Sequence, residues 1–143
     1  MKKAILLGLD GSESSERALA FALDHALKTQ LKLIIVHIIP WSPYGFNTPE
    51  ENETRHLKKE QEIETAQRQV LNPIISRLPE ELEYESLILH GNPAQLICQI
   101  ARDKDVEQIV VGRRGRSNLT ALFFGSVTGS LVQIAPAPVT VVP

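Results

Sequence analysis

Several residue types are scarce in this 143-residue sequence, and each scarcity excludes a class of protein. Cys98 is the single cysteine, so no disulfide can form within the chain, which fits a reducing compartment. The net charge of −2 gives no general attraction to nucleic acid or to anionic membranes. No segment approaches the roughly 18 uninterrupted apolar residues that a membrane-spanning helix needs. We therefore expect a cytoplasmic protein that binds neither nucleic acid nor membrane.

The sequence also lacks the motifs of efficient nucleotide hydrolysis. It has no Gly-x-x-x-x-Gly-Lys-Ser/Thr phosphate loop, and no acidic pair for a metal ion lies beside its glycine-rich segment, residues 112–126. No residue near that segment is an evident base for activating water. We expect no catalytic residue and no metal site formed by protein side chains.

Short apolar segments alternate with amphipathic segments along the whole chain. The apolar segments predict five strands, at residues 4–9, 31–39, 83–89, 109–111 and 139–142. Apolar residues at helical spacing predict helices between them, at residues 13–27, 53–78, 93–101 and 127–135. This alternation predicts an α/β fold with a parallel sheet and helices on both faces, formed by residues 1–143 as a single domain.

Individual residues mark where helices begin or bend. Asn92 followed by Pro93 predicts an N-cap and the first helical position. Pro73 predicts a kink or a restart in the long helix of residues 53–78, with Asn72 as the cap. The charges between Arg55 and Glu64 predict a solvated face of that helix.

Three further features have a structural interpretation and a functional one. His37, inside an apolar strand, is interpreted as a hydrogen-bonded core residue, and Cys98 as a buried, inert thiol. Residues 41–52 predict a loop, in which Trp41, Tyr44 and Phe46 either flank a ligand or pack over the edge of the sheet.

Residues 108–127, QIVVGRRGRSNLTALFFGSV, combine a strand, a glycine-containing loop and the start of a helix. A helix N-terminus leaves backbone N–H groups unpaired and carries a partial positive charge. Glycines let the backbone approach an anion closely. The segment therefore suits phosphate binding by Gly112, Gly115, Gly125 and Ser126. The alternative is that the glycines only turn the chain and that Ser126 only caps the helix.

The spacing of these residues resembles a known nucleotide loop. Gly112, two residues, Gly115, nine residues and then Gly125-Ser126 match the loop of the ATP-binding branch of the universal stress protein family. The resemblance implies a doubly wound, Rossmann-like sheet in the order 3-2-1-4-5 and ATP as the ligand, with or without Mg²⁺. It implies a site that consists of Leu9, Asp10, Ile38, Val111, Gly112, Arg113, Gly115, Arg116, Gly125, Ser126, Val127 and Thr128.

The resemblance also assigns roles within this site. Asp10-Gly11-Ser12 is similar to the family's first-strand motif, whose Asp contacts the adenosine end of ATP; the alternative is a turn or cap residue. The family's backbone at the position of Ile38 contacts the adenine edge. Thr128 is a secondary phosphate candidate, because the family often has a hydroxyl residue there.

Three arginines make the predicted loop unusually basic. Arg113, Arg114 and Arg116 either contact phosphates or are solvated surface charges, and the sequence favours neither.

The resemblance implies a nucleotide-dependent regulator in the stress response, a binding module with weak hydrolysis at most. The alternatives are a slow ATPase or adenylyl-transfer enzyme on a related fold, and a structural dimer that binds no nucleotide. Residues 139–142 form an apolar strand at the end of the chain, so we expect a homodimer that covers this edge by two-fold symmetry.

Overall fold

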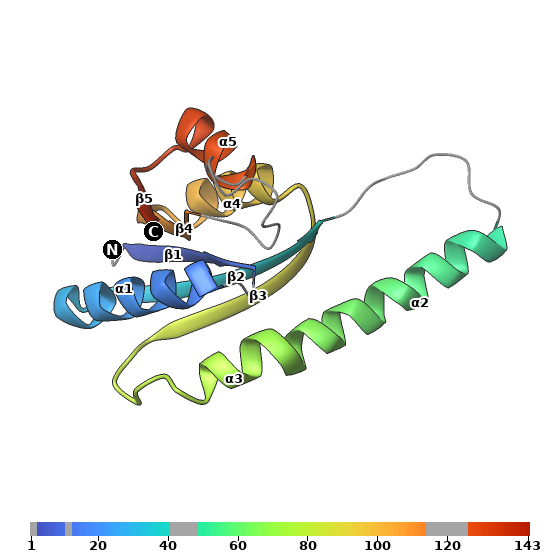
Figure 1. Ribbon diagram of the computed structural model, residues 1–143, viewed down its shortest axis with the longest axis horizontal. Helices are drawn as coiled ribbons and strands as arrows, with labels where there is room; N and C mark the ends of the chain where they lie inside the picture. The colour runs from blue at the N-terminus through green and yellow to red at the C-terminus, as the bar shows by residue number, and fades with distance from the viewer. Residues whose placement is uncertain (1–2, 11–12, 41–48, 114–125) are drawn as a thin grey trace.

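The structure is a computed structural model, and it describes residues 3–10, 13–40, 49–113 and 126–143. Its centre is a five-stranded parallel sheet in the order β3-β2-β1-β4-β5 (Figure 1). The strands are β1 (Ala4–Leu9), β2 (Lys32–Pro40), β3 (Tyr84–Gly91), β4 (Val106–Gly112) and β5 (Val139–Val142). The predicted α/β class and the predicted strand order are both confirmed.

Helices cover both faces of the sheet, as predicted. They are α1 (Glu13–Thr29), α2 (Pro49–Ala66), η1 (Gln67–Leu71), α3 (Asn72–Ile75), α4 (Pro93–Asp103) and α5 (Ser126–Ile134). In Figure 1, α4 and α5 lie on one side of the sheet, with α1 and α3 on the other, while the N-terminal part of α2 extends away from the sheet.

Strand alternation creates a separate hydrophobic core on each face. One core includes Leu6, Ile34 and Ile109 packed with residues of α4 and α5. The other includes Leu7 and Ile35 packed with residues of α1, η1 and α3. The central strands read as continuous apolar runs because both of their faces are buried.

Two predictions about the long helical region are wrong. α2 begins at Pro49, inside the predicted loop of residues 41–52. A proline followed by two glutamates suits the first turn of a helix, because the proline lacks the N–H that would be unpaired there and acidic groups favour the positive helix end. The predicted aromatic trio Trp41, Tyr44 and Phe46 lies outside the described residues.

The second wrong prediction is the cap at Asn72. Asn72 has helical angles, φ −57° and ψ −42°, and its backbone N–H bonds to the Gln67 carbonyl. Its side-chain oxygen accepts a hydrogen bond from Gln67 Nε2 at 2.7 Å. The π-helical segment η1 immediately precedes Pro73, where the missing N–H interrupts the α-helical bonding pattern. The predicted disturbance at Pro73 is therefore present, with a π segment in place of a capped restart.

Candidate functional site

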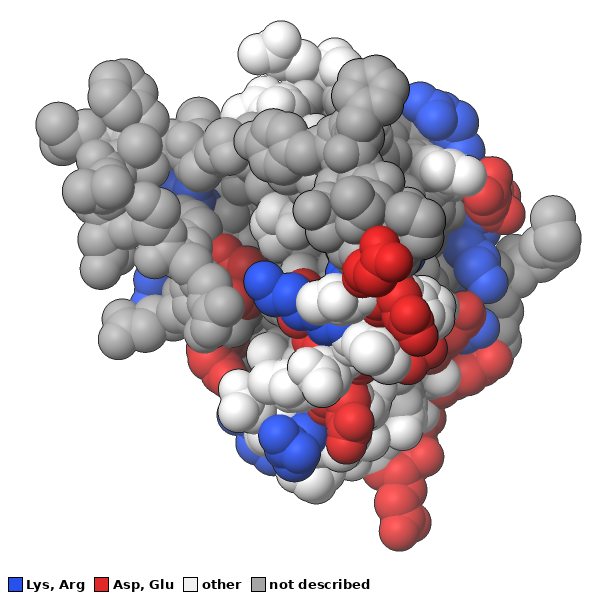
Figure 2. Space-filling view, turned by 90° about the vertical axis from the view of Figure 1, so that its right-hand side faces the viewer, with Lys and Arg blue, Asp and Glu red and all other residues white. Residues whose placement is uncertain are grey.

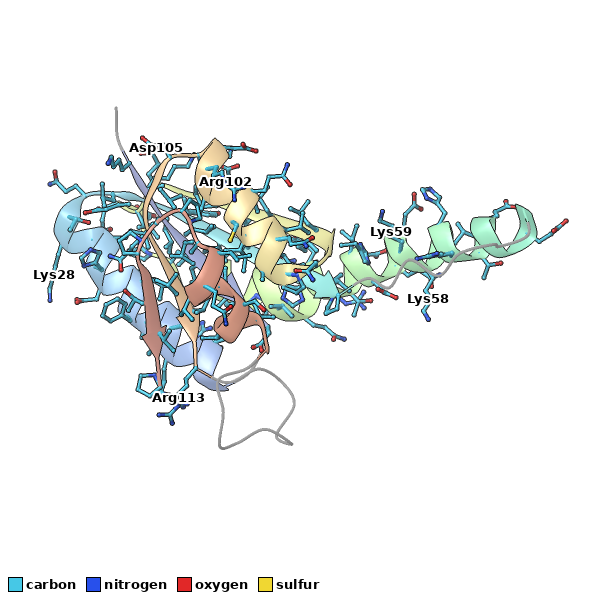
Figure 3. All side chains as sticks on the ribbon, turned by 90° about the horizontal axis from the view of Figure 1, so that it is seen from above. Lys28, Lys58, Lys59, Arg102, Asp105 and Arg113 are labelled. Carbon is cyan, nitrogen blue, oxygen red and sulfur yellow. The ribbon has the colours of Figure 1, made fainter. Side chains whose placement is uncertain are left out.

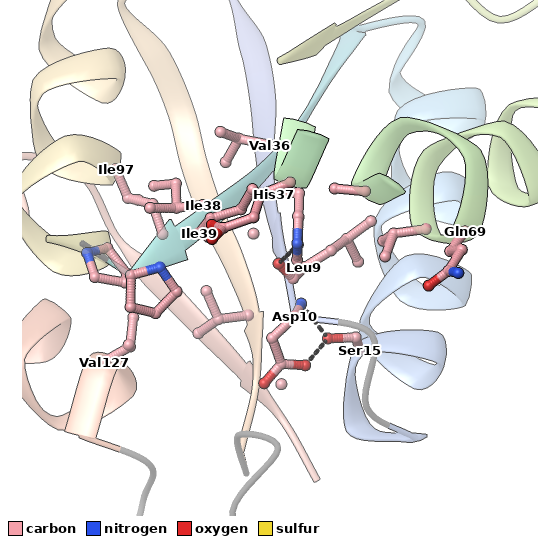
Figure 4. A pocket seen from close by; sticks show the side chains of 18 of the residues that line it. Leu9, Asp10, Ser15, Val36, His37, Ile38, Ile39, Gln69, Ile97 and Val127 are labelled. Carbon is pink, nitrogen blue, oxygen red and sulfur yellow. Dashed lines mark hydrogen bonds between the residues drawn. The ribbon is translucent and has the colours of Figure 1, made fainter. Parts of the chain in front are cut away.

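A cavity of about 900 Å³ lies at the carboxyl ends of β1, β2 and β4 (Figure 4). In open parallel sheets this edge is the usual place for a ligand, at the point where the strand order reverses. Here β1 is the central strand, with β2 and β3 on one side of it and β4 and β5 on the other, so the order reverses between β1 and β4. Seven residues of the predicted site line the cavity: Leu9, Asp10, Ile38, Val111, Gly112, Val127 and Thr128.

The remaining predicted residues are placed differently. Gly115, Arg116 and Gly125 lie outside the described residues, as does Arg114. Ser126 is the first residue of α5, and its side chain is also outside the described part. Arg113 is exposed and is not among the described residues that line the cavity. Its side chain lies beyond the end of β4 (Figure 3), and its N–H donates to the Val142 carbonyl at 2.8 Å, which continues the β4–β5 pairing.

Asp10 directly follows β1 and is hydrogen-bonded to Ser15 in the first turn of α1. The Ser15 hydroxyl donates to Asp10 Oδ1 at 2.7 Å, and the Asp10 N–H donates to Ser15 Oγ at 3.0 Å (Figure 4). This reciprocal pair fixes the carboxylate at the mouth of the cavity. The carboxylate therefore has a structural role in the turn and is also placed to accept hydrogen bonds from a ligand.

Thr128 is 4% exposed, and its Oγ1 donates to the Gly112 carbonyl at 2.9 Å. The bond ties the first turn of α5 to the end of β4. A hydroxyl has one hydrogen, so in this arrangement Thr128 has none left for a phosphate oxygen.

The backbone carbonyl of Ile38 faces the cavity because of the pairing pattern of β2. Leu33 donates its N–H to the Glu83 carbonyl on the β3 side, at 2.9 Å. Alternate residues of a parallel strand direct their backbone groups to opposite neighbours, so Ile38 directs its groups to the β1 side. The β1–β2 pairing ends with Leu9 opposite His37. The Ile38 carbonyl therefore lies next to the gap beyond the end of β1.

The cavity has an apolar part and a polar part, on opposite faces of the sheet. Five apolar residues on the α4–α5 face line the first part: Val36, Ile38, Ile97, Val111 and Val127. The second part lies on the α1–α2 face, where the polar lining residues are Ser15, His37, Lys58, Gln61, Glu62, Thr65 and Gln69. An apolar slot beside hydrogen-bonding groups suits a small ligand with a flat base and a polar remainder.

Comparison with known proteins identifies the family. The family model described as the universal stress protein family matches residues 1–143. The chain belongs to the universal stress protein family. A universal stress protein of Thermus aquaticus is 34% identical over 144 residues, which cover 99% of each chain. The chain spans under half, 44%, of the length of the mycobacterial universal stress proteins that it also matches.

Solved structures with the same fold agree with this assignment. The structure of MJ0577, reported as a structure-based assignment of biochemical function, is 28% identical, with a TM-score of 0.83 over 99% of this chain and 96% of that chain. The universal stress protein from Archaeoglobus fulgidus in complex with dAMP is 21% identical, with a TM-score of 0.60 over 99% of this chain and 98% of that chain. At 21% identity the likeness shows the fold.

In this universal stress protein, α2 forms a wall of the cavity that the sequence did not reveal. Lys58, Gln61, Glu62, Thr65 and Gln69 are the polar residues that α2 and η1 add to the lining. The charged stretch of residues 55–64 reads as a solvated face, and much of it is exposed. No local pattern shows which of its residues lie beside the sheet edge, so this wall could be found only in the folded chain.

A hydrogen-bonding contact joins this wall to β3. His90 Nε2 lies 3.1 Å from Glu62 Oε2, and the His90 side chain is 3% exposed. The contact connects α2 to the carboxyl end of β3, whose backbone pairs with the last residues of β2. Glu62 therefore holds α2 beside the strands that form the floor of the cavity.

Other chemistry in the described residues lies away from the cavity. Cys98 is buried, and burial raises the pKa of its thiol, which fits the prediction of an inert residue.

The described residues contain no group of three His, Cys, Asp or Glu side chains that could hold a metal ion. Among the described helices, none has the length and apolar character needed to span a membrane. On the face in Figure 2, acidic and basic side chains are interspersed.

Proposed function

We propose that this universal stress protein binds an adenine nucleotide, with ATP as the main ligand, and acts as a nucleotide-dependent regulator with little or no hydrolysis. The observation that carries the proposal is the two-part cavity at the switch point of the sheet, with its apolar slot beside Ile38 and its carboxylate at Asp10. In this proposal a flat purine lies in the apolar slot that Ile97 and Val127 line, and the nearby polar groups suit a nucleoside.

The two ends of the predicted phosphate-binding segment lie next to this slot. Gly112 lines the cavity at the end of β4, and α5 begins at Ser126. A helix N-terminus favours negative charge, so the triphosphate of ATP, with or without Mg²⁺, would extend from the slot toward α5. The dAMP complex of the Archaeoglobus relative supports an adenine nucleotide as the class of ligand, on the level of a shared fold.

A regulatory role is proposed because the described lining lacks the parts of an efficient phosphoryl-transfer site. In that lining Lys58 is the only lysine, and it lies on α2, across the cavity from α5. The carboxylates in the same lining, Asp10 and Glu62, are engaged with Ser15 and His90. ATP would then remain bound without being hydrolysed, and its presence or absence would change how the protein interacts with a partner protein.

The experiment is direct analysis of the bound ligand. Freshly purified protein is denatured, and the released small molecules are separated and identified by mass spectrometry. We expect ATP or another adenine nucleotide at close to one per chain. Calorimetry with added ATP and an assay of steady-state phosphate release follow on the same preparation.

Three results would contradict parts of the proposal. No released nucleotide together with no heat of ATP binding would favour the structural dimer. Phosphate release at many cycles per minute, lost in an Asp10→Ala variant, would favour the slow enzyme. Release of a ligand without adenine would show that the proposed class of ligand is wrong, while the cavity would remain the candidate site.

A further inference from the structure

His37 is a buried side chain at the cavity to which the proposed function gives no role. It lies near the end of β2, lines the cavity and is 8% exposed. Its Nδ1 lies 2.8 Å from the Leu9 carbonyl oxygen. A carbonyl oxygen can only accept, so Nδ1 carries the proton, and Nε2 of the neutral ring is an acceptor. The described residues offer no hydrogen bond to Nε2.

The bond to Leu9 also fixes where the ring lies. Leu9 is the last residue of β1 and pairs with His37 in the sheet. The ring is therefore held over the end of β1, as Figure 4 shows. The Ile38 carbonyl faces the same gap beyond the end of β1, because Ile38 directs its backbone groups to the β1 side of β2. The Ile38 carbonyl at the edge of β2 and the His37 ring on the α1–α2 side of that strand thus border the same part of the cavity.

β2 adds no donor to this gap. Ile38 directs its N–H to the Leu9 carbonyl through the last step of the β1–β2 pairing, so only its carbonyl remains. Pro40 is the next residue of β2 on that side, and proline has no N–H. A ligand group that enters the gap therefore meets two acceptors, and buried acceptors require donors.

We propose that His37 is a specificity-determining residue, whose Nε2 accepts a hydrogen bond from the exocyclic amino group of the bound base. This inference rests on the proposed function. The 6-amino group of adenine has two hydrogens, one for the Ile38 carbonyl and one for His37 Nε2. Hypoxanthine and guanine carry an oxygen at that position, which would face two acceptors with no hydrogen between them. The site therefore selects a 6-aminopurine against a 6-oxopurine.

The expected discrimination follows from the cost of unpaired buried acceptors. Such groups are costly to bury without a donor, so the parent protein should bind ATP roughly 10- to 100-fold more tightly than ITP. ITP is the better comparison ligand than GTP, because it differs from ATP at the 6-position without an added 2-amino group.

Two substitutions separate the two nitrogens of the ring. His37→Asn places an amide N–H near the position of Nδ1, so the bond to Leu9 is kept and the Nε2 acceptor is lost. His37→Gln places an amide near the position of Nε2, where rotation offers either an acceptor or a donor to the base. His37→Asn should weaken ATP binding about tenfold without weakening ITP binding. His37→Gln should retain ATP binding while ITP binding becomes tighter.

The test is calorimetric titration of ATP and ITP into the parent and both variants, with circular dichroism to confirm folding. If the His37→Asn variant does not fold, the His37→Gln variant alone decides, through its increased affinity for ITP. Equal affinity of the parent for ATP and ITP, or equal loss of both ligands in the Asn variant, would overturn the role of His37 and leave nucleotide binding intact. A parent that binds neither ligand would overturn the proposed function and this inference with it.

Discussion

At the scale of single residues, Gly8 shows how a position in β1 controls the shape of the cavity. A Cβ on Gly8 would lie 3.1 Å from Ile97 Cδ1 and 3.3 Å from Val111 Cγ1. Both side chains belong to the apolar part of the cavity, and both would have to move. The absence of a side chain at Gly8 therefore keeps the slot open for a flat ligand.

We predict that Gly8→Ala narrows the slot. Displacement of two packed side chains should lower the free energy of unfolding by about 1 kcal/mol and weaken nucleotide binding several-fold. Urea unfolding and calorimetry measure the two effects. Gly129→Ala is the matched control, because a Cβ there has no atom within 4 Å, and it should raise stability by about 0.5–1 kcal/mol through helix propensity. Equal behaviour of the two variants would contradict the steric argument.

For Asp10, an experiment can separate its structural role in the turn from its proposed role as a hydrogen-bond acceptor for the ligand. Asp10→Ala should weaken ATP binding about tenfold, because it removes an acceptor for the nucleoside, while inorganic triphosphate should bind as before. Ser15→Ala is the control: it removes the same hydrogen bonds within the turn and leaves the carboxylate in place. Calorimetry of both ligands with both variants gives the answer. If Ser15→Ala weakens ATP binding as much, Asp10 acts only through the turn.

At the scale of elements, Glu85 joins two strands and the end of a helix. Its carboxylate lies 3.0 Å from Lys32 Nζ on β2 and 3.1 Å from Lys104 Nζ at the end of α4. Hydrogen bonds from Lys32 and then from Lys104 hold the pKa of Glu85 below its ordinary value. Because the pKa of Glu85 is lower in the folded than in the unfolded protein, its ionised form stabilises the fold at pH values above the unfolded pKa. This contribution is lost as the pH falls through the folded pKa.

We therefore predict a pH-dependent cost for Glu85→Gln. The variant should be less stable than the parent by about 0.5–1 kcal/mol at pH 7, with the difference shrinking toward zero as the pH falls below about 4. Urea unfolding at several pH values measures it. Glu16→Gln, which breaks the more exposed pair with Arg77, should show a smaller difference at pH 7. A Glu85→Gln difference that is unchanged at low pH would exclude the ion pair as its source.

At the scale of the whole molecule, β5 forms one edge of the sheet. The carbonyls of Pro138 and Val142 accept hydrogen bonds from β4, so Val139 and Val141 direct their backbone groups outward. The four residues of β5 are only partly buried. We propose that the β5 strands of two chains pair across a two-fold axis, because an open apolar edge favours association.

This proposal predicts a dimer that one proline can disrupt. Val141→Pro removes an outward N–H and leaves the hydrogen bonds from β4 in place, so the chain should fold and become a monomer. Light scattering at micromolar concentration measures the mass of parent and variant, and circular dichroism checks the fold. Val132→Ser, at an exposed apolar residue of α5, is a control that should remain dimeric. A monomeric parent would refute the dimer, and a dimeric Val141→Pro variant would place its interface elsewhere.

The sequence by itself determined the order of strands and helices, and the predicted site includes seven residues that line the cavity. Continuous apolar runs predicted β1 and β5 with their observed bounds, because a short apolar run is visible in the sequence without knowledge of its partners. Asn92 was predicted as a cap, and its side chain accepts the Gln95 N–H at 3.0 Å. His37 was predicted as a bonded core residue, which its contact with Leu9 confirms. These features depend on neighbours along the chain or on burial alone.

Only the tertiary structure decided how these elements combine. Periodicity did not place β1 beside β4; the resemblance to a family supplied that order, and long-range pairing produces it. No local signal showed that α2 contributes a wall of the cavity or that Thr128 bonds to Gly112, because both contacts join residues far apart in sequence. The contact of His37 Nδ1 with the Leu9 carbonyl likewise depends on where β1 ends. Composition and spacing identify the residue types along the chain. The candidate site, however, is formed by the ends of β1, β2 and β4, which only the folded chain brings together.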